Sequence, residues 1–182
     1  MAILEMIPVS IKRLVKLIFV AVAVLLVSVK AQAQAPDDSA RLYAAYTYNF
    51  MRFTQWPIVS EESKVTLCVA GQNRDSQLLK QLDGKGLQGS IIEVIAYQPT
   101  MSLDQCQVLF VASTEHADLF DRAVHLPILL LTNIMPDNGR ASMITLITDS
   151  GKVVFDVNLS LIKRVGLQLP PSLLKLARSV SK

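Results

Sequence analysis

Short apolar runs, separated by polar stretches and amphipathic segments, make up most of this 182-residue chain. Six of the runs are rich in β-branched and leucine side chains and are bounded by turn-forming residues, which is typical of strands. The predicted strands are residues 64–71, 90–96, 107–112, 128–132, 143–148 and 152–158. In the first of them Val65, Leu67 and Val69 alternate with Cys68 and Ala70. Both faces of that strand are therefore apolar and should be buried.

Other segments repeat their apolar residues every three or four positions, which is typical of amphipathic helices. The longest should begin with Ser39 as its N-cap and run to about Thr54, because Pro57 disfavours its continuation. Its large apolar side chains are predicted to share the face that packs on the sheet: Leu42, Tyr43, Tyr46, Phe50 and Phe53. Three polar residues should point away: Asn49, Arg52 and Gln55. Shorter helices are predicted at residues 75–82, 116–124, 159–163 and 172–179.

The order of these elements indicates the fold class. Helices alternate with buried strands up to residue 132, which predicts an α/β domain with a largely parallel central sheet and helices on both faces. The tight turn Asp149-Ser150-Gly151-Lys152 joins the last two predicted strands, so the sheet should carry an antiparallel hairpin at its edge. Residues 34–182 are expected to form a single domain, since one domain typically takes roughly 100–200 residues.

The first 33 residues have the layout of a secretory signal peptide. Lys12, Arg13 and Lys16 precede the apolar run of residues 17–29, and small residues follow it. The run is shorter than the roughly 20 residues of a membrane span, so cleavage after Ala33 or Ala35 is expected. The long positive region and Lys30 leave an uncleaved N-terminal anchor as the alternative. In both cases the remainder of the chain is exported, which places it in the periplasm if the host is bacterial.

The charge balance argues against nucleic-acid binding. Residues 1–33 hold four of the 18 basic side chains and one of the 15 acidic ones, so the exported part has 14 of each and no net charge. Its longest basic run is Lys163-Arg164. No basic patch therefore indicates a nucleic-acid partner.

The chain shows no recognisable catalytic constellation. Residues 84–89 match G-x-G-x-x-G, but they follow a predicted helix and precede a strand, which is the reverse of a dinucleotide site. His116 and His125 flank a short predicted helix, and no G-x-S-x-G, H-E-x-x-H or C-x-x-C sequence accompanies them. We therefore expect no enzyme activity, no metal and no cofactor.

Cys68 and Cys106 are the only cysteines of the chain. In an oxidising compartment two cysteines at strand ends can form a disulfide, and the alternative is a pair of buried free thiols.

Several motifs together resemble the YfiR-like family of bacterial periplasmic proteins. The motifs appear in the same order as in the family, between Arg41 and Val180. They are YTYNFMRFTQWP, LCVAG, LDGKGLQGSIIEV, CQVLFVAS and VVFDVNLSLIKRVGLQLPPSLLKLARSV. The resemblance implies a repressor that binds the periplasmic part of an inner-membrane diguanylate cyclase and so lowers cyclic di-GMP and biofilm formation. It also implies sequestration of the repressor by an outer-membrane lipoprotein, and a homodimer.

The resemblance assigns roles to particular residues. It implies a disulfide between Cys68 and Cys106, whereas a second cysteine pair of the family, around residues 142–150, is missing here. It further implies a partner or ligand pocket lined by Asp156, Ile162 and Arg164, although Asp156 and Arg164 can equally form a plain surface ion pair.

Three further residues are candidates for a partner surface. Trp56 ends the aromatic helix, and Leu173 and Leu176 lie in the last predicted helix. In each case burial in the core is the alternative. A different function, a periplasmic small-molecule binding module that signals to another membrane protein, also fits the sequence.

Overall fold

The computed structural model describes residues 38–57, 64–137 and 139–182, so the predicted signal peptide lies outside the described residues. Asp38–Lys182 form one structural unit. The strands are β1 (Lys64–Ala70), β2 (Gly86–Leu87), β3 (Ser90–Ala96), β4 (Val108–Val111), β5 (Leu129–Thr132), β6 (Ile144–Asp149), β7 (Lys152–Asn158) and β8 (Ser179–Ser181). The α-helices are α2 (Asp38–Phe53), α3 (Arg74–Leu79), α4 (Asp118–Ala123), α5 (Leu159–Arg164) and α6 (Pro171–Leu174). Short 3₁₀ turns are η2 (Lys80–Leu82), η3 (Leu103–Gln105) and η4 (Thr114–His116).

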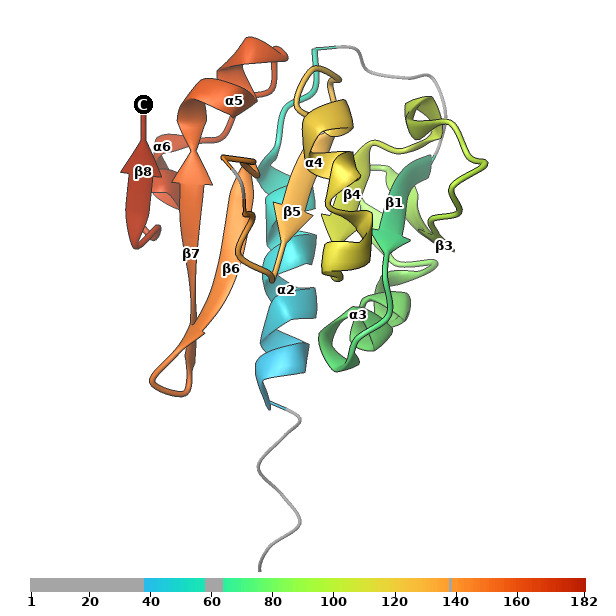
Figure 1. Ribbon diagram of the computed structural model, residues 1–182, viewed down its shortest axis with the longest axis horizontal. Helices are drawn as coiled ribbons and strands as arrows, with labels where there is room; N and C mark the ends of the chain where they lie inside the picture. The colour runs from blue at the N-terminus through green and yellow to red at the C-terminus, as the bar shows by residue number, and fades with distance from the viewer. Residues whose placement is uncertain (1–37, 58–63, 138) are drawn as a thin grey trace, which may run out of the picture. The chain divides into compact units, whose positions relative to one another are not determined.

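The strands form one mixed sheet in the order β2-β3-β1-β4-β5-β6-β7-β8. The pairs β2-β3 and β6-β7 are antiparallel and the other pairs are parallel. Helix α2 covers one face of the sheet and α4 the other (Figure 1). The predicted α/β class, with a largely parallel sheet and helices on both faces, is confirmed.

The end of the chain differs from the prediction. The helix predicted at residues 172–179 has only one turn, α6, after which the chain turns into β8 and pairs in parallel with β7. The backbone N–H of Arg178 donates to the carbonyl of Phe155 at 2.8 Å. The open edge of β7 thus satisfies backbone groups that a longer helix would satisfy internally. The hairpin β6-β7 forms as predicted, but β8 covers it, so the edges of the sheet are β2 and β8.

Helix α2 buries a different set of side chains from the predicted face. Tyr43 and Phe50 are buried, and the Phe50 ring lies 5.0 Å from that of Phe155 on β7. Leu42 and Phe53 are 41% and 43% exposed, so their predicted place on this face is wrong. Each residue turns the helix by about 100°, so the buried stripe is centred on the side of Thr47, and Leu42 and Phe53 fall beside it. Small or flexible residues complete the buried stripe: Ala40, Ala44, Thr47, Met51 and Thr54.

The loops that follow β1 and β4 touch each other at Gly71. This glycine has φ +90°, and a Cβ placed on it would lie 2.6 Å from the Cβ of Ser113. Asn73, the N-cap of α3, donates its side-chain amide to the carbonyl of Ala112 at 2.7 Å and ties the same two loops together. The two strand ends are therefore closed against each other.

Replacement of Gly71 by alanine is expected to lower the free energy of unfolding by about 2–3 kcal/mol, because an unfavourable φ is combined with overpacking. Urea denaturation measures this change. Gly89→Ala is the matched control, since Gly89 has φ +93° but nothing within 4 Å of the added Cβ. It should lose only about 1 kcal/mol, the backbone part of the effect. Equal losses in the two variants would contradict the contact with Ser113.

Candidate binding surfaces

A disulfide joins Cys68 in β1 to Cys106 at the entrance to β4, with 5.7 Å between the two Cα atoms. Both residues are buried, at 0% and 3% exposure. The bond that the family resemblance implies is thus present in the structure. It closes a covalent loop that contains α3, β2 and β3, and its two cysteines are 38 positions apart in the sequence.

The usual ligand crevice of an open α/β sheet is filled in this protein. Such sheets bind ligands outside the carboxyl ends of the strands where the strand order reverses, which here is between β1 and β4. That position is occupied by the contact of Gly71 with Ser113 and by the Asn73 hydrogen bond. Beside it, Asn133 at the end of β5 donates to the carboxylate of Asp75 at 2.8 Å. The chain's own loops take the place of a ligand.

The histidines and the glycine-rich stretch do not form a site. His116 packs edge-on against the ring of Tyr97, with 5.9 Å between the centroids, and His125 is exposed after α4. Residues 84–89 follow η2 and lead through β2 into β3, so they are a connector as predicted. In the described segments no three His, Cys, Asp or Glu side chains are grouped as a metal site would require.

The structure does not bring together the three residues of the predicted pocket. Ile162 on α5 is fully buried, so it belongs to the core and cannot line a surface pocket. Asp156 on β7 accepts hydrogen bonds from two guanidinium nitrogens of Arg178, at 3.0 and 2.5 Å. These bonds raise the pKa of Arg178 above its usual value. Arg164 is exposed and is not the partner of Asp156. The predicted grouping is therefore wrong for Ile162, and the ion pair exists with a different arginine.

A cleft of about 460 Å³ lies instead beside α5 and α6. Local sequence explains its walls: the Asn158 side chain caps α5 by accepting from the N–H of Leu161 at 3.1 Å, and Gly166 ends the helix at φ +81°. Pro170 and Pro171 then start α6. The lining residues are mainly apolar: Leu159, Lys163, Gly166, Leu167, Gln168, Leu169, Pro171 and Leu174.

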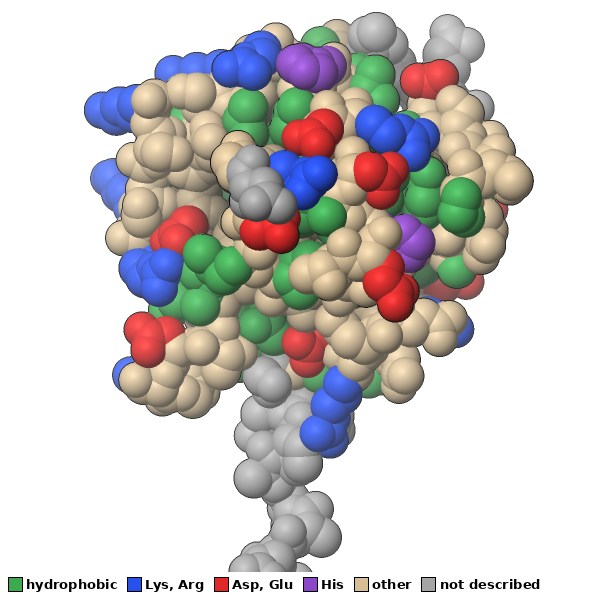
Figure 2. Space-filling model, in the orientation of Figure 1, with side chains coloured by type: hydrophobic (Ala, Val, Ile, Leu, Met, Phe, Trp, Pro, Cys, Tyr) green, Lys and Arg blue, Asp and Glu red, His purple; other side chains and the backbone are tan. Residues whose placement is uncertain are grey.

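Three cations lie on α5 and at the end of α6: Lys163, which lines this cleft, Arg164 and Lys175. All three are exposed, and none of them forms an ion pair with another described residue. Lys and Arg side chains gather at the upper left of Figure 2, over α5 and the end of the chain. We call the group Lys163, Arg164, Leu174, Lys175 and Leu176 the α5–α6 surface.

The remaining candidates for a partner surface divide between core and surface. Leu173 is buried, at 6% exposure, so it supports α6 from inside. Leu176 is 71% exposed, in the turn after α6. Trp56 is half-buried and lines a separate cavity together with Pro57. The sequence pattern could not show that Leu173 is buried and Leu176 exposed, because in the continuous helix that it predicted the two residues lie on the same side.

Comparison with known proteins gives one family. The family model described as YfiR/HmsC-like matches residues 40–178, which is most of the chain. No curated protein matches the chain in a sequence comparison. None of the described helices is long and apolar enough to cross a membrane. The chain belongs to the YfiR/HmsC-like family, a regulatory and non-catalytic family of periplasmic proteins in cyclic di-GMP signalling.

Proposed function

We propose that this protein is exported by its N-terminal signal peptide and restrains an inner-membrane diguanylate cyclase from the periplasm. It does so by direct binding to the periplasmic part of the cyclase, which lowers cyclic di-GMP and biofilm formation. The family membership supports a regulator in this signalling system. The buried Cys68–Cys106 disulfide fits an oxidising compartment. Sequestration by an outer-membrane lipoprotein and a homodimeric state belong to the same proposal.

The observation that carries the binding proposal is the α5–α6 surface. It combines an apolar cleft and a strongly exposed leucine, Leu176, with three cations that form no ion pair with a described acid. Burial of a leucine side chain in an interface stabilises a complex by about 1.5–3 kcal/mol. The cations favour a partner segment with acidic residues, and they should raise the rate of association at low salt. A regulator that works by contact needs such a surface.

The α5–α6 surface predicts a loss of repression in Leu176→Glu. The change should weaken binding of the cyclase by about tenfold or more, since it removes apolar contact and adds a negative charge that repels an acidic partner segment. Cellular cyclic di-GMP, measured in a deletion strain complemented with each variant, should rise toward the level of the uncomplemented deletion. The double variant Lys163→Glu/Arg164→Glu should act in the same direction.

Met135→Glu is the matched control, because Met135 is 70% exposed and lies outside the α5–α6 surface. It should repress as well as the unchanged protein. A complementing chain without residues 1–33 should fail to repress, since it would not be exported. If Leu176→Glu and the charge-reversal variant accumulate, fold and repress normally, the α5–α6 surface is not the contact site. If deletion of the gene leaves cyclic di-GMP unchanged, the cyclase proposal itself is wrong.

A second candidate function, a small-molecule binding module that signals to another membrane protein, is favoured by the cavity beside Trp56. A ligand that binds only the folded protein raises its melting temperature with the logarithm of the free ligand concentration. Such stabilisation, combined with unchanged cyclic di-GMP in the deletion strain, would favour this function over cyclase repression.

A further inference from the structure

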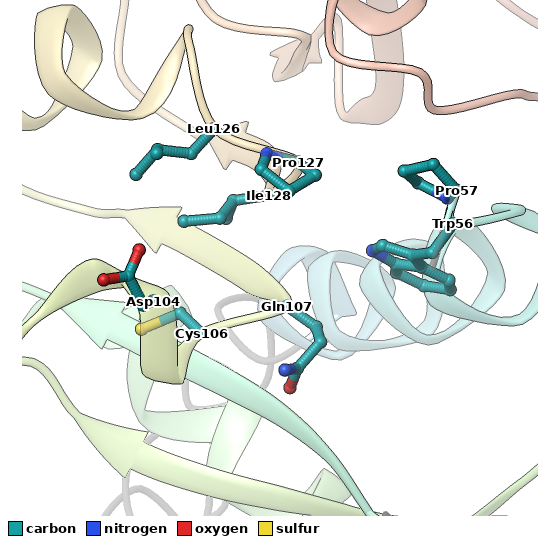
Figure 3. Close-up of a pocket in the computed structure, with 8 residues that line it drawn as sticks. All are labelled: Trp56, Pro57, Asp104, Cys106, Gln107, Leu126, Pro127 and Ile128. Atoms are coloured by element: carbon teal, nitrogen blue, oxygen red, sulfur yellow. The ribbon is translucent and has the colours of Figure 1, made fainter. Parts of the chain in front are cut away.

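A cavity of about 330 Å³ lies at the amino ends of β4 and β5. The filled crevice lies at the opposite, carboxyl ends of the strands. Its walls are apolar for the most part, and one polar and one acidic side chain complete them (Figure 3). The lining residues are Trp56, Pro57, Asp104, Cys106, Gln107, Leu126, Pro127 and Ile128. Small-molecule sites have this size and this composition, a mainly apolar lining with few polar groups.

The side of the cavity formed by Trp56 is held by the fold. The hydroxyl of Thr54 donates to the carbonyl of Phe50 at 2.7 Å and fixes the end of α2. Gln55 and Gln168 exchange two backbone hydrogen bonds, at 3.0 and 3.1 Å. The indole ring is therefore held on a supported segment, which lowers the entropic penalty of ordering it around a ligand.

The indole N–H of Trp56 is a buried donor without an acceptor among the described residues. Figure 3 shows the ring nitrogen on the side that faces Ile128 and the interior of the cavity. A buried donor that lacks a partner destabilises the folded protein by about 1–3 kcal/mol, so such groups are rare and call for an explanation. The nitrogen has no solvent-accessible surface, so the indole must rotate before an acceptor in the cavity can reach its N–H.

Gln107 offers a second donor. Its side-chain oxygen accepts from the N–H of Thr66 at 2.8 Å, which assigns the amide and leaves the nitrogen without a hydrogen bond to any described residue. Asp104 is exposed and accepts from the hydroxyl of Ser102 at 2.9 Å, and no cation pairs with it among the described residues. The residues that line the cavity thus carry two donors without an acceptor among the described residues and one negative charge, which disfavours an anionic ligand.

We propose that this cavity binds small neutral molecules that have a compact apolar body and a carbonyl-type hydrogen-bond acceptor. The apolar body fills the space between Pro57, Leu126 and Ile128. The acceptor takes the hydrogen bond of the Trp56 indole, or that of the Gln107 amide next to it. This site is separate from the α5–α6 surface and does not depend on cyclase repression.

The test uses the single tryptophan of the chain as a reporter. The purified exported protein is titrated with camphor, a rigid neutral ketone, and the indole N–H signal is followed by ¹H–¹⁵N NMR. A saturable downfield shift of this signal is expected, because hydrogen bonding deshields the proton. Camphene, a bicyclic hydrocarbon without oxygen, should bind about tenfold more weakly and should not produce the downfield shift.

Variants locate the binding site by calorimetry. Trp56→Phe keeps an aromatic ring but removes the donor, so it should lower the affinity for camphor about tenfold and leave that for camphene unchanged. Leu126→Phe fills the cavity from a partly exposed position and should weaken both. Leu78→Phe, at a partly buried position on α3, is the matched control and should change neither.

The outcomes separate clearly. Loss of camphor binding in Leu126→Phe but not in Leu78→Phe, together with the indole shift, supports the site. Absence of a saturable shift, equal affinities for camphor and camphene, or binding that Leu126→Phe leaves intact would overturn it. Circular dichroism of each variant confirms that it is folded before binding is interpreted. Failure of this test leaves the cyclic di-GMP measurements unaffected, so the two proposals can fail separately.

Discussion

Loss of the Cys68–Cys106 disulfide is expected to lower the free energy of unfolding by about 4 kcal/mol. The bond closes a loop of 38 residues, and the chain-entropy model assigns roughly this value to a loop of that length. Because Cys68 is buried in β1 and Cys106 is buried just before β4, their removal also releases the connection between β1 and the start of β4. An effect of this size is a large fraction of the 5–15 kcal/mol that stabilises a typical domain.

Urea denaturation of the oxidised protein and of the Cys68→Ala/Cys106→Ala variant measures the effect. Reduced wild-type protein is the second comparison, since it has the same residues without the bond. The variant and the reduced protein should agree to within about 1 kcal/mol, because two small buried groups replace each other. A loss below about 1 kcal/mol in both would contradict a stabilising role, and a loss in the variant alone would point to packing rather than to the bond.

Replacement of Phe155 by alanine is expected to cost about 3–5 kcal/mol of stability. Its ring is 1% exposed and lies between the sheet and α2, with centroids 5.0 Å from Phe50 and 5.6 Å from Tyr46. The truncation leaves a cavity under the only long helix of the described residues and removes two aromatic contacts. The midpoint of urea denaturation should fall with an unchanged slope.

Phe53→Ala is the matched control for this prediction. It is the same chemical change on the end of α2, but the side chain is 43% exposed, and its partner is the nearby guanidinium of Arg52, 5.7 Å from the ring centroid. We expect a loss of less than about 1 kcal/mol, since surface substitutions have small effects. Similar losses in Phe53→Ala and Phe155→Ala would contradict the buried face of α2 that the structure shows.

The differences between the predicted and the observed elements have local causes. All six predicted strands are present within one or two residues, because a fully buried strand needs a continuous apolar run and the chain has such runs. The last helix was predicted too long because Leu173, Leu176 and Ala177 have helical spacing. The competing element was the unpaired edge of β7. This strand ends at Asn158, 21 positions before β8 begins at Ser179, so a local sequence pattern could not show the pairing.

The candidate sites were less accessible to prediction than the fold. The family motifs identified the disulfide correctly, since cysteine has few alternatives in an exported protein. They did not show that Ile162 is buried, because the spacing of apolar residues around it fits a core position as well as a surface position. The partner of Asp156 proved to be Arg178, which β8 brings beside it, rather than Arg164. The cavity at Trp56 combines residues from three separate segments, so no local pattern could reveal it.

The amino-acid sequence alone determined the α/β class, six of the eight described strands and the family of this protein, because these depend on local periodicity, composition and motif order. Only the tertiary structure decided which side of α2 is buried, how β8 closes the sheet beside β7, and which charges and cavity walls meet. These features depend on contacts between residues far apart in the chain. Such contacts are selected by the packing of whole elements, which no single stretch of sequence encodes.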